Sequence, residues 1–198
     1  MKLPIFPLNG VVLFPDTNLP LNIFEKRYLE MVDFALTRDR CIGMIQTTSN
    51  NLIYNVGCVG KINSFSETND GRYLISLQGT NCFKVDKELE KTFNFRIVEA
   101  KLLNNLNSSN ILLSKKQKIN LLSKYEKYIA VKNINLNLEE LKEIDVSQLI
   151  KFIAMISPFK NEDKQVLLEV ESLVEFYDKL VSIIEIEILG DYSNNTIN

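Results

Sequence analysis

The stretch 3–28 limits the fold most, because it holds four of the five prolines in the chain. A proline fixes its own φ and has no N–H to give to a central strand ladder. The apolar bursts between these prolines therefore predict three short strands at 3–8, 11–14 and 19–24, with turns at 9–10 and 15–16. Short strands with sharp corners are typical of a small closed or nearly closed barrel.

The next segments continue this pattern up to about residue 103. Residues 25–37 carry apolar side chains at helical spacing and predict one amphipathic helix packed on the barrel. Apolar runs and alternation predict further strands at 41–45, 56–66, 73–78, 81–87 and 92–101. Asp70-Gly71 between two of these runs predicts a hairpin, for which a type I′ turn requires positive φ at both central residues.

The hydrophobic period changes in the second half. Residues 104–110 are rich in Asn and Ser and predict a linker, after which a period of 3.6 predicts helices. We expect helices over 111–132, after caps at Asn137, Asp145 and Asn161, and over 172–189, with a buried apolar helix around 150–156. The predicted organisation is a β subdomain 1–103, a linker 104–110, a helical subdomain 111–190 and a disordered tail 191–198.

The absence of histidine excludes Ser-His-Asp and Cys-His catalysis and most zinc sites. Cys41, Cys58 and Cys82 are widely spaced among apolar residues and are expected to be buried thiols, not disulfides or metal ligands. We therefore expect no catalytic residues, no metal and no cofactor. The segment Gly57–Lys61 lacks both the first glycine and the hydroxyl residue of a P-loop.

The charge pattern gives little reason to expect nucleic acid or membrane partners. The net charge is -2, and Lys84, Lys87, Lys91 and Arg96 are offset by nearby acidic residues. No apolar run is long enough to span a bilayer, and the N-terminus lacks the unbroken apolar segment of a signal peptide. A cytoplasmic location is the expectation.

Three long segments carry a family resemblance. They are LPIFPLNGVVLFPDTNLPLNIFEKRYLEMV, GCVGKINSFSETNDGRYLISLQGTNCFKV and LIKFIAMISPFKNEDKQVLLEVESLVEFYDKLVSIIEIEI. In this order, from about residue 2 to 189, they resemble the N-terminal substrate-recognition domain of Lon protease, with Asn22 where that family commonly has histidine. The resemblance implies an α+β fold: a PUA-like β pseudo-barrel with one packed helix, followed by a helical subdomain that ends in a long helix.

The resemblance also implies a role, which is to bind unfolded or degron-bearing polypeptide. The full protease adds an ATPase and a Ser-Lys peptidase module, which have no counterpart here, so we expect a non-enzymatic, free-standing domain of bacterial type. A groove for the peptide is predicted at the proline-rich corner. Its predicted lining is Phe14, Pro15, Leu19, Pro20 and Phe24, with Arg27 and Tyr28 beside it. The same residues could instead form the core of the barrel.

Two other functions remain open at this stage. The first is an adaptor or regulator that docks on a protease, a chaperone or another protein through the helical half. On the last helix Phe176, Ile183 and Ile186 lie outside the main apolar stripe and mark a possible interaction surface. The second is a PUA-like module associated with RNA. The oligomeric state cannot be predicted.

Overall fold

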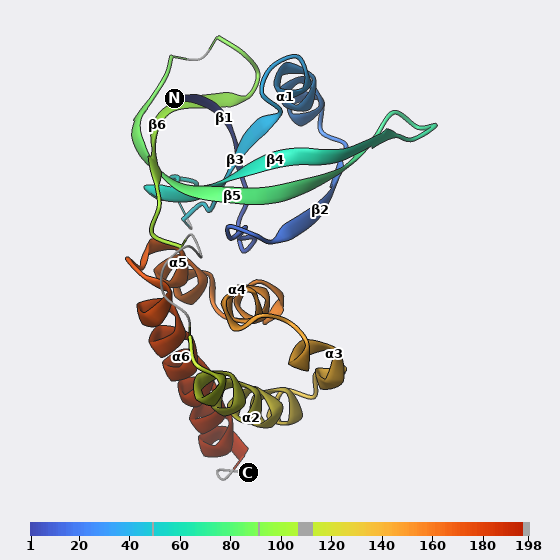
Figure 1. Cartoon of the computed structure of the whole chain (residues 1–198). Coiled ribbons are helices and arrows are strands. Elements are labelled where there is room, and N and C mark those ends of the chain that lie inside the picture. The colour runs from blue at the N-terminus through green and yellow to red at the C-terminus, as the bar shows by residue number, and fades with distance from the viewer. Residues whose placement is uncertain (49, 91, 107–112, 196–198) are drawn as a thin grey trace.

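The structure is a computed structural model that describes residues 1–48, 50–90, 92–106 and 113–195, with side chains described as far as residue 190. A curled sheet with one helix packed on it is followed by a group of helices (Figure 1). The elements of the sheet half are β1 (Lys2–Pro7), β2 (Asn18–Ile23), α1 (Lys26–Leu36), β3 (Cys41–Ile45), β4 (Val56–Glu67), β5 (Tyr73–Glu88) and β6 (Arg96–Leu103). Those of the helical half are α2 (Lys115–Val131), α3 (Leu138–Lys142), α4 (Val146–Ile156), α5 (Asn161–Glu169) and α6 (Leu173–Asn195).

The sheet has the strand order β2-β5-β4-β3-β1-β6, and β6 also pairs with β5. Only the β1–β3 pairing is parallel among the described ladders. The long strand β5 pairs with β2 along its first half and with β6 along its second half, so the sheet curls back toward itself. This confirms the predicted α+β fold with a β pseudo-barrel. It is not a closed barrel, because β2 is attached to the sheet through β5 alone in the described pairings.

The predicted strand at 11–14 is wrong. Val12, Leu13 and Phe14 form no strand but are buried, because this irregular segment passes between the sheet and the helices. The predicted hairpin lies where expected, but its turn differs. Only Gly71 of the Asp70-Gly71 pair has a positive φ, at 80°, and the Gly71 N–H donates to the Thr68 carbonyl. This is not a type I′ turn, which has positive φ at both central residues.

Residues 73–88 form one strand where two were predicted, because Gly79 is part of β5 and not a break in it. The segment that follows Phe14 crosses the sheet at this glycine. The Asp16 N–H donates to the Gly79 carbonyl at 2.9 Å, and the Gly79 N–H donates to the Thr17 carbonyl at 2.8 Å. A Cβ on Gly79 would lie 2.0 Å from the Phe14 carbonyl oxygen, so only glycine allows this approach.

Capping explains most of the helix starts. Asn137 and Asp145 accept backbone N–H groups at the starts of α3 and α4, as predicted, and Ser114 with Gln117 forms a capping box on α2. The predicted cap at Asn161 is wrong. Asn161 is the first residue of α5, and its side chain donates to Asn9 Oδ1 at 2.6 Å, which ties α5 to the loop after β1.

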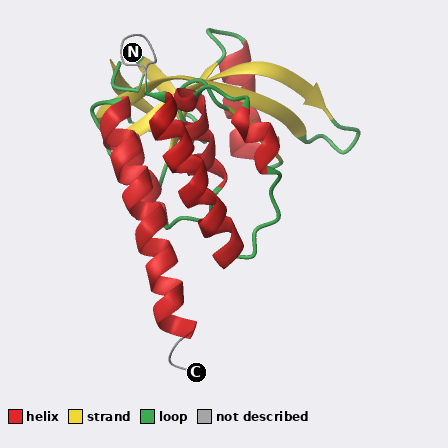
Figure 2. Cartoon of the chain, turned by 60° about the horizontal axis from the view of Figure 1, so that its bottom comes forward, coloured by secondary structure: helices red, strands yellow, loops and turns green. Residues whose placement is uncertain are grey.

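The last helix is longer than predicted. α6 continues past Leu189 to Asn195, so the residues predicted to begin a disordered tail have helical backbone, while 196–198 lie outside the described residues. Figure 2 shows the C-terminal part of α6 extending beyond the neighbouring helices. Of the predicted linker, residues 104–106 are described and Leu106 is buried, whereas 107–110 lie outside the described part.

The two halves meet along a buried contact region that we call the seam. Phe14 and Phe176 pack edge to face, with ring centroids 5.3 Å apart. The Lys151 ammonium, which has no exposed side-chain surface, lies 2.9 Å from Asp16 Oδ2. The buried Gln165 amide donates to the Val56 carbonyl, and the buried Gln46 amide donates to Gln165 Oε1 and to the Asn161 carbonyl. These buried polar contacts cross the seam and fix the position of the sheet half relative to the helical half.

Replacing Gly79 with alanine tests the crossing. We expect Gly79→Ala to lower the free energy of unfolding by about 2–3 kcal/mol, because the new methyl group overlaps the backbone at Phe14. Gly190→Ala is the matched control. A Cβ there meets nothing within 4 Å, and alanine is expected to stabilise α6 by up to about 1 kcal/mol. Urea unfolding of both variants measures the difference, and a Gly79→Ala variant as stable as wild type would contradict the crossing.

Replacing Asp16 with asparagine tests the ion pair in the seam. Asp16 has a φ of 65°, a conformation that asparagine tolerates, so the backbone is preserved while the carboxylate is lost. We expect the free energy of unfolding to fall by about 1–3 kcal/mol, because the buried Lys151 loses its charged partner. Lys151→Met replaces the buried charge with an apolar side chain and is expected to stay within about 1 kcal/mol of wild type. If both variants lost the same free energy of unfolding, the loss in Asp16→Asn would not come from leaving the buried Lys151 without a charged partner.

Candidate functional site

Three of the residues predicted to line a groove lie in the core. Phe14 and Pro15 are buried at the seam, and the buried Tyr28 ring packs on Phe6 with centroids 4.3 Å apart. Phe14 has no exposed surface, because Phe176 covers it from the helical half. These side chains cannot contact a ligand in this structure, so their assignment to a groove is corrected here.

The other four predicted residues reach the surface to different degrees. Leu19 is half-buried, while Pro20, Phe24 and Arg27 are exposed. Phe24 is 67% exposed, which is high for a large apolar side chain. The Arg27 guanidinium pairs with Glu25 at 2.8 Å and lies over the Tyr28 ring, 4.5 Å from its centroid. Arg27 is therefore held by its neighbours, whereas Phe24 is free of such contacts in the described structure.

Phe24 directly follows the last residue of β2, Ile23, and extends the alternation of Pro20 and Asn22 by one position. Residues paired across neighbouring strands place their side chains on the same face, and alternate residues along a strand share it. Asn22 pairs with Leu74, which pairs with Ser66, and Pro20 pairs with Ser76, which pairs with Ser64. We call this surface the outer face. It consists of Pro20, Asn22, Phe24, Ser64, Ser66, Leu74 and Ser76.

None of these seven residues is charged, and the two large apolar side chains are exposed, Phe24 by 67% and Leu74 by 44%. The same pairing rule continues through Asn18 and Gln78 to the exposed Lys61, which borders the outer face. Beside it lies the outer edge of β2, which pairs with no strand in the described part of the chain. In a regular antiparallel ladder a proline nitrogen points away from the partner strand. Pro20 therefore removes one N–H from the centre of this free edge, which limits the addition of a further strand.

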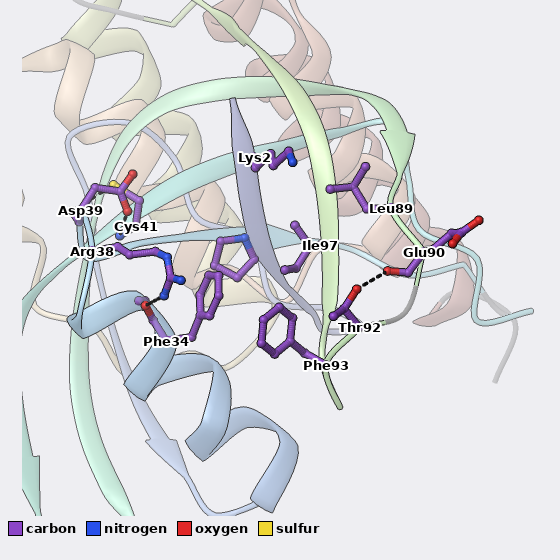
Figure 3. Close-up of a pocket in the computed structure, with 12 residues that line it drawn as sticks. Lys2, Phe34, Arg38, Asp39, Cys41, Leu89, Glu90, Thr92, Phe93 and Ile97 are labelled. Carbon is purple, nitrogen blue, oxygen red and sulfur yellow. Dashed lines mark hydrogen bonds between the residues drawn. The ribbon is translucent and has the colours of Figure 1, made fainter.

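A concave site lies at the C-terminal end of α1 (Figure 3). It is a pocket of about 520 Å³ between the end of α1, strand β1 and the segment that joins β5 to β6. Phe34 and Phe93 form aromatic walls, packed edge to face at 5.0 Å, and Phe93 also stacks on Phe95. Pro4, Ala35, Leu89 and Ile97 complete the apolar lining, and Lys2, Arg38, Asp39 and Glu90 lie at the rim.

The polar groups of this pocket are fixed by local contacts. The Arg38 guanidinium lies 3.6 Å from the Phe34 ring centroid and donates from Nη1 to the Phe34 carbonyl at 3.0 Å. Asp39 Oδ1 accepts the Cys41 N–H at 3.2 Å. Burial and, to a lesser degree, the Asp39 carboxylate raise the pKa of the Cys41 thiol, so this thiol is protonated at neutral pH and a poor nucleophile. The pocket therefore combines an apolar lining with a guanidinium held in place and a protonated thiol.

The chain is similar in sequence to a known family of protein domains. The family model of the ATP-dependent protease La (LON) substrate-binding domain matches residues 2–185. The chain belongs to this family. The Lon protease of Buchnera aphidicola subsp. Schizaphis graminum is 25% identical over 202 residues, and that of Trichlorobacter lovleyi is 28% identical over 191 residues. These alignments cover 95% and 90% of this chain but 25% and 23% of the relatives.

Solved Lon N-terminal domains share the fold. The Lon N-terminal domain protein from Xanthomonas campestris aligns with a TM-score of 0.70 at 19% identity, over 92% of this chain and 98% of the other. The N-terminal domain of Mycobacterium avium complex Lon protease aligns with a TM-score of 0.69 at 14% identity, over 93% and 98%. The resemblance seen in the sequence is thus confirmed. The chain spans about a quarter of the length of the curated relatives that it matches.

In this Lon substrate-binding domain the predicted surface on α6 is mostly core. Phe176 has no exposed surface and Ile183 is 9% exposed, because they face the seam and the neighbouring helices. Ile186 is 67% exposed, and Leu189 beside it is 66% exposed. The patch that α6 offers to another protein therefore lies nearer its C-terminal end than the sequence predicted.

The basic residues noted in the sequence form no free stripe in the Lon domain. Arg96 makes two hydrogen bonds to the Glu88 carboxylate, at 2.7 and 2.6 Å, and Lys87 pairs with Glu99 at 3.3 Å. Lys91 lies outside the described residues. Within the part of the chain that is described, no helix has the length and apolar character needed to cross a bilayer.

Sequence reasoning missed the pocket of Figure 3. Phe93 falls within the predicted strand at 92–101, whereas β6 begins only at Arg96. The available signal was the spacing of Phe34 and Arg38, four residues apart at the end of a helix, which allows the cation to stack on the ring.

Proposed function

We propose that this chain is a non-catalytic module that binds unfolded or degron-bearing polypeptide segments in extended form. The family supports substrate binding in general, and the outer face supports this particular form of it. The single observation that carries the proposal is the exposure of Phe24 and Leu74 beside the free edge of β2. Exposed apolar surface of this kind is characteristic of interaction sites.

The composition of the outer face suits a ligand of variable sequence. Phe24, Leu74 and Pro20 offer apolar contact, and the serine and asparagine side chains can exchange hydrogen bonds with the backbone of an extended chain. The free edge of β2 adds backbone hydrogen bonds on both sides of Pro20.

The predicted binding residues take separate parts in this proposal. Pro20 and Phe24 contact the segment directly, and Leu19 borders it from β2. Arg27 lies beside the path of the chain, while the buried Phe14, Pro15 and Tyr28 support the surface from below. Leu74 is a contact that sequence analysis did not include.

The remaining parts of the proposal concern the biological setting. The relatives are proteases of which this chain matches about a quarter, so we propose that it selects polypeptides in the cytoplasm for degradation by separate catalytic modules. It carries out no catalysis itself in this proposal. Its partners are the bound polypeptides and a protease or chaperone that receives them.

A second candidate is an adaptor that docks on another protein through the helical half. The adjacent exposure of Ile186 and Leu189 favours it. In this alternative the polypeptide need not bind the outer face at all. The RNA-associated alternative gains no comparable observation, because the basic residues near β6 pair with carboxylates.

The test compares two substitutions of equally exposed apolar residues. Phe24→Ser removes the main apolar contact of the outer face, and Ile119→Ser on α2 is the control, since Ile119 is 70% exposed. Titration of fluorescently labelled, unfolded casein by anisotropy gives the dissociation constants. We expect Phe24→Ser to weaken binding by about 5- to 10-fold, because the bound segment buries part of the phenylalanine side chain. The control is expected to bind like wild type.

Both variants are expected to unfold at the temperature of the wild type, because neither side chain is buried. Equal binding by all three proteins would remove the outer face as the site. No binding by wild-type protein would remove the polypeptide-binding proposal itself.

A further inference from the structure

The pocket of Figure 3 combines an apolar interior with one unpaired arginine. Three of the five arginines in the chain, Arg27, Arg72 and Arg96, pair with a carboxylate. Arg38 forms no ion pair in the described structure, although its guanidinium is held in place by the Phe34 ring and the Phe34 carbonyl. A guanidinium that is held in place but makes no ion pair is suited to bind a carboxylate through its planar fork.

The interior suits one large apolar side chain. Its volume of about 520 Å³ lies within the range of ligand pockets. The Phe34 and Phe93 rings meet edge to face, with Phe95 stacked on one face of Phe93 and Arg38 over one face of Phe34. A further ring would pack on the remaining aromatic surface, best edge to face or offset. Leu89 and Ile97 supply aliphatic contact on the side opposite α1.

The charges at the rim give the ligand a direction. Figure 3 shows Arg38 and Glu90 at opposite ends of the pocket. Lys2 adds a second cation that forms no ion pair in the described residues, whereas the Asp39 carboxylate beside Arg38 keeps its negative charge and accepts the Cys41 N–H through Oδ1. Direct contact with the Arg38 fork therefore has to outweigh Asp39 to hold an anionic group at this end, and Glu90 repels such a group at the other end.

From these features we infer that this pocket binds the C-terminal residue of a polypeptide whose side chain is aromatic or large and aliphatic. The side chain packs beside the Phe34–Phe93 pair, against Leu89 and Ile97, and the terminal α-carboxylate binds Arg38. The preceding residues leave the pocket on the side of Glu90. The inference rests on the proposed function in that the ligand is a polypeptide, but it assigns a second site that distinguishes a chain end from an internal segment.

The test uses two peptides that differ only at the terminus. A labelled, uncharged ten-residue peptide ending in phenylalanine is prepared with a free carboxylate and as the C-terminal amide. We expect the free acid to bind about tenfold more tightly in an anisotropy titration, because the amide cannot form the charged pair with Arg38. Arg38→Gln is expected to abolish this preference. Since Arg38 is exposed, the variant is expected to fold like wild type.

The matched control is Lys127→Gln, which removes one positive charge from an exposed position on α2 and is expected to keep the tenfold preference. Free N-acetyl-phenylalanine, which has the same side chain and carboxylate, is expected to bind far more weakly than the peptide acid. Equal affinity of the two would show that the pocket takes a small carboxylic acid instead of a chain end and would overturn the inference.

Equal affinity of acid and amide for the wild type would also overturn the inference, as would an undiminished preference in Arg38→Gln. Phe24→Ser separates this site from the outer face, since it is expected to weaken casein binding while leaving the preference for the free acid. If the wild type binds unfolded casein but shows no preference for the acid, only the pocket assignment fails. If it binds neither casein nor peptide, the proposed function fails with it.

Discussion

The seam between the sheet and the helices is the constraint on which the rest of this structure depends, and the pair of Lys151 with Asp16 is one of its buried contacts. An ammonium group with no exposed side-chain surface requires a partner, and Asp16 supplies it from the loop between β1 and β2. This contact holds residues 14–17 against α4 and places Phe14 on Phe176. The same segment crosses Gly79, which keeps β5 continuous and lets it pair with both β2 and β6. The sheet and the helices therefore share one main core.

The seam also determines which surfaces remain for a ligand. It buries Phe14 and Pro15 from the sheet half together with Phe176 from α6, so in this structure these residues pack in the core. What stays accessible on the sheet half is the outer face, the edge of β2 and the pocket at the end of α1. In our proposals these surfaces provide two kinds of contact, the outer face for extended segments and the aromatic pocket for a chain end.

Local sequence patterns predicted the helices and strands well and the tertiary contacts between them poorly. Proline spacing located β1 and β2, alternation located β4, and side-chain caps located α3 and α4, because each of these signals acts within a few residues. The segment 11–14 has the composition of a strand, but tertiary packing at the seam decides its conformation. Lys151 lies within an apolar helix, and nothing near it in sequence indicates Asp16 as its partner. The pocket joins residues 2–4, 34–41, 89–90 and 92–97, which only the fold brings together.

Amide chemical-shift mapping tests most directly the claim that the sheet half carries the binding surfaces. A ¹H–¹⁵N spectrum of the labelled chain is recorded while an unfolded polypeptide and then a peptide with a free apolar C-terminus are added. The account predicts the largest shifts at residues 18–24 and 73–76 for the first ligand and around Arg38 and Phe93 for the second, with α2 and α6 unchanged. Shifts concentrated on α6 near Ile186 and Leu189 would contradict it.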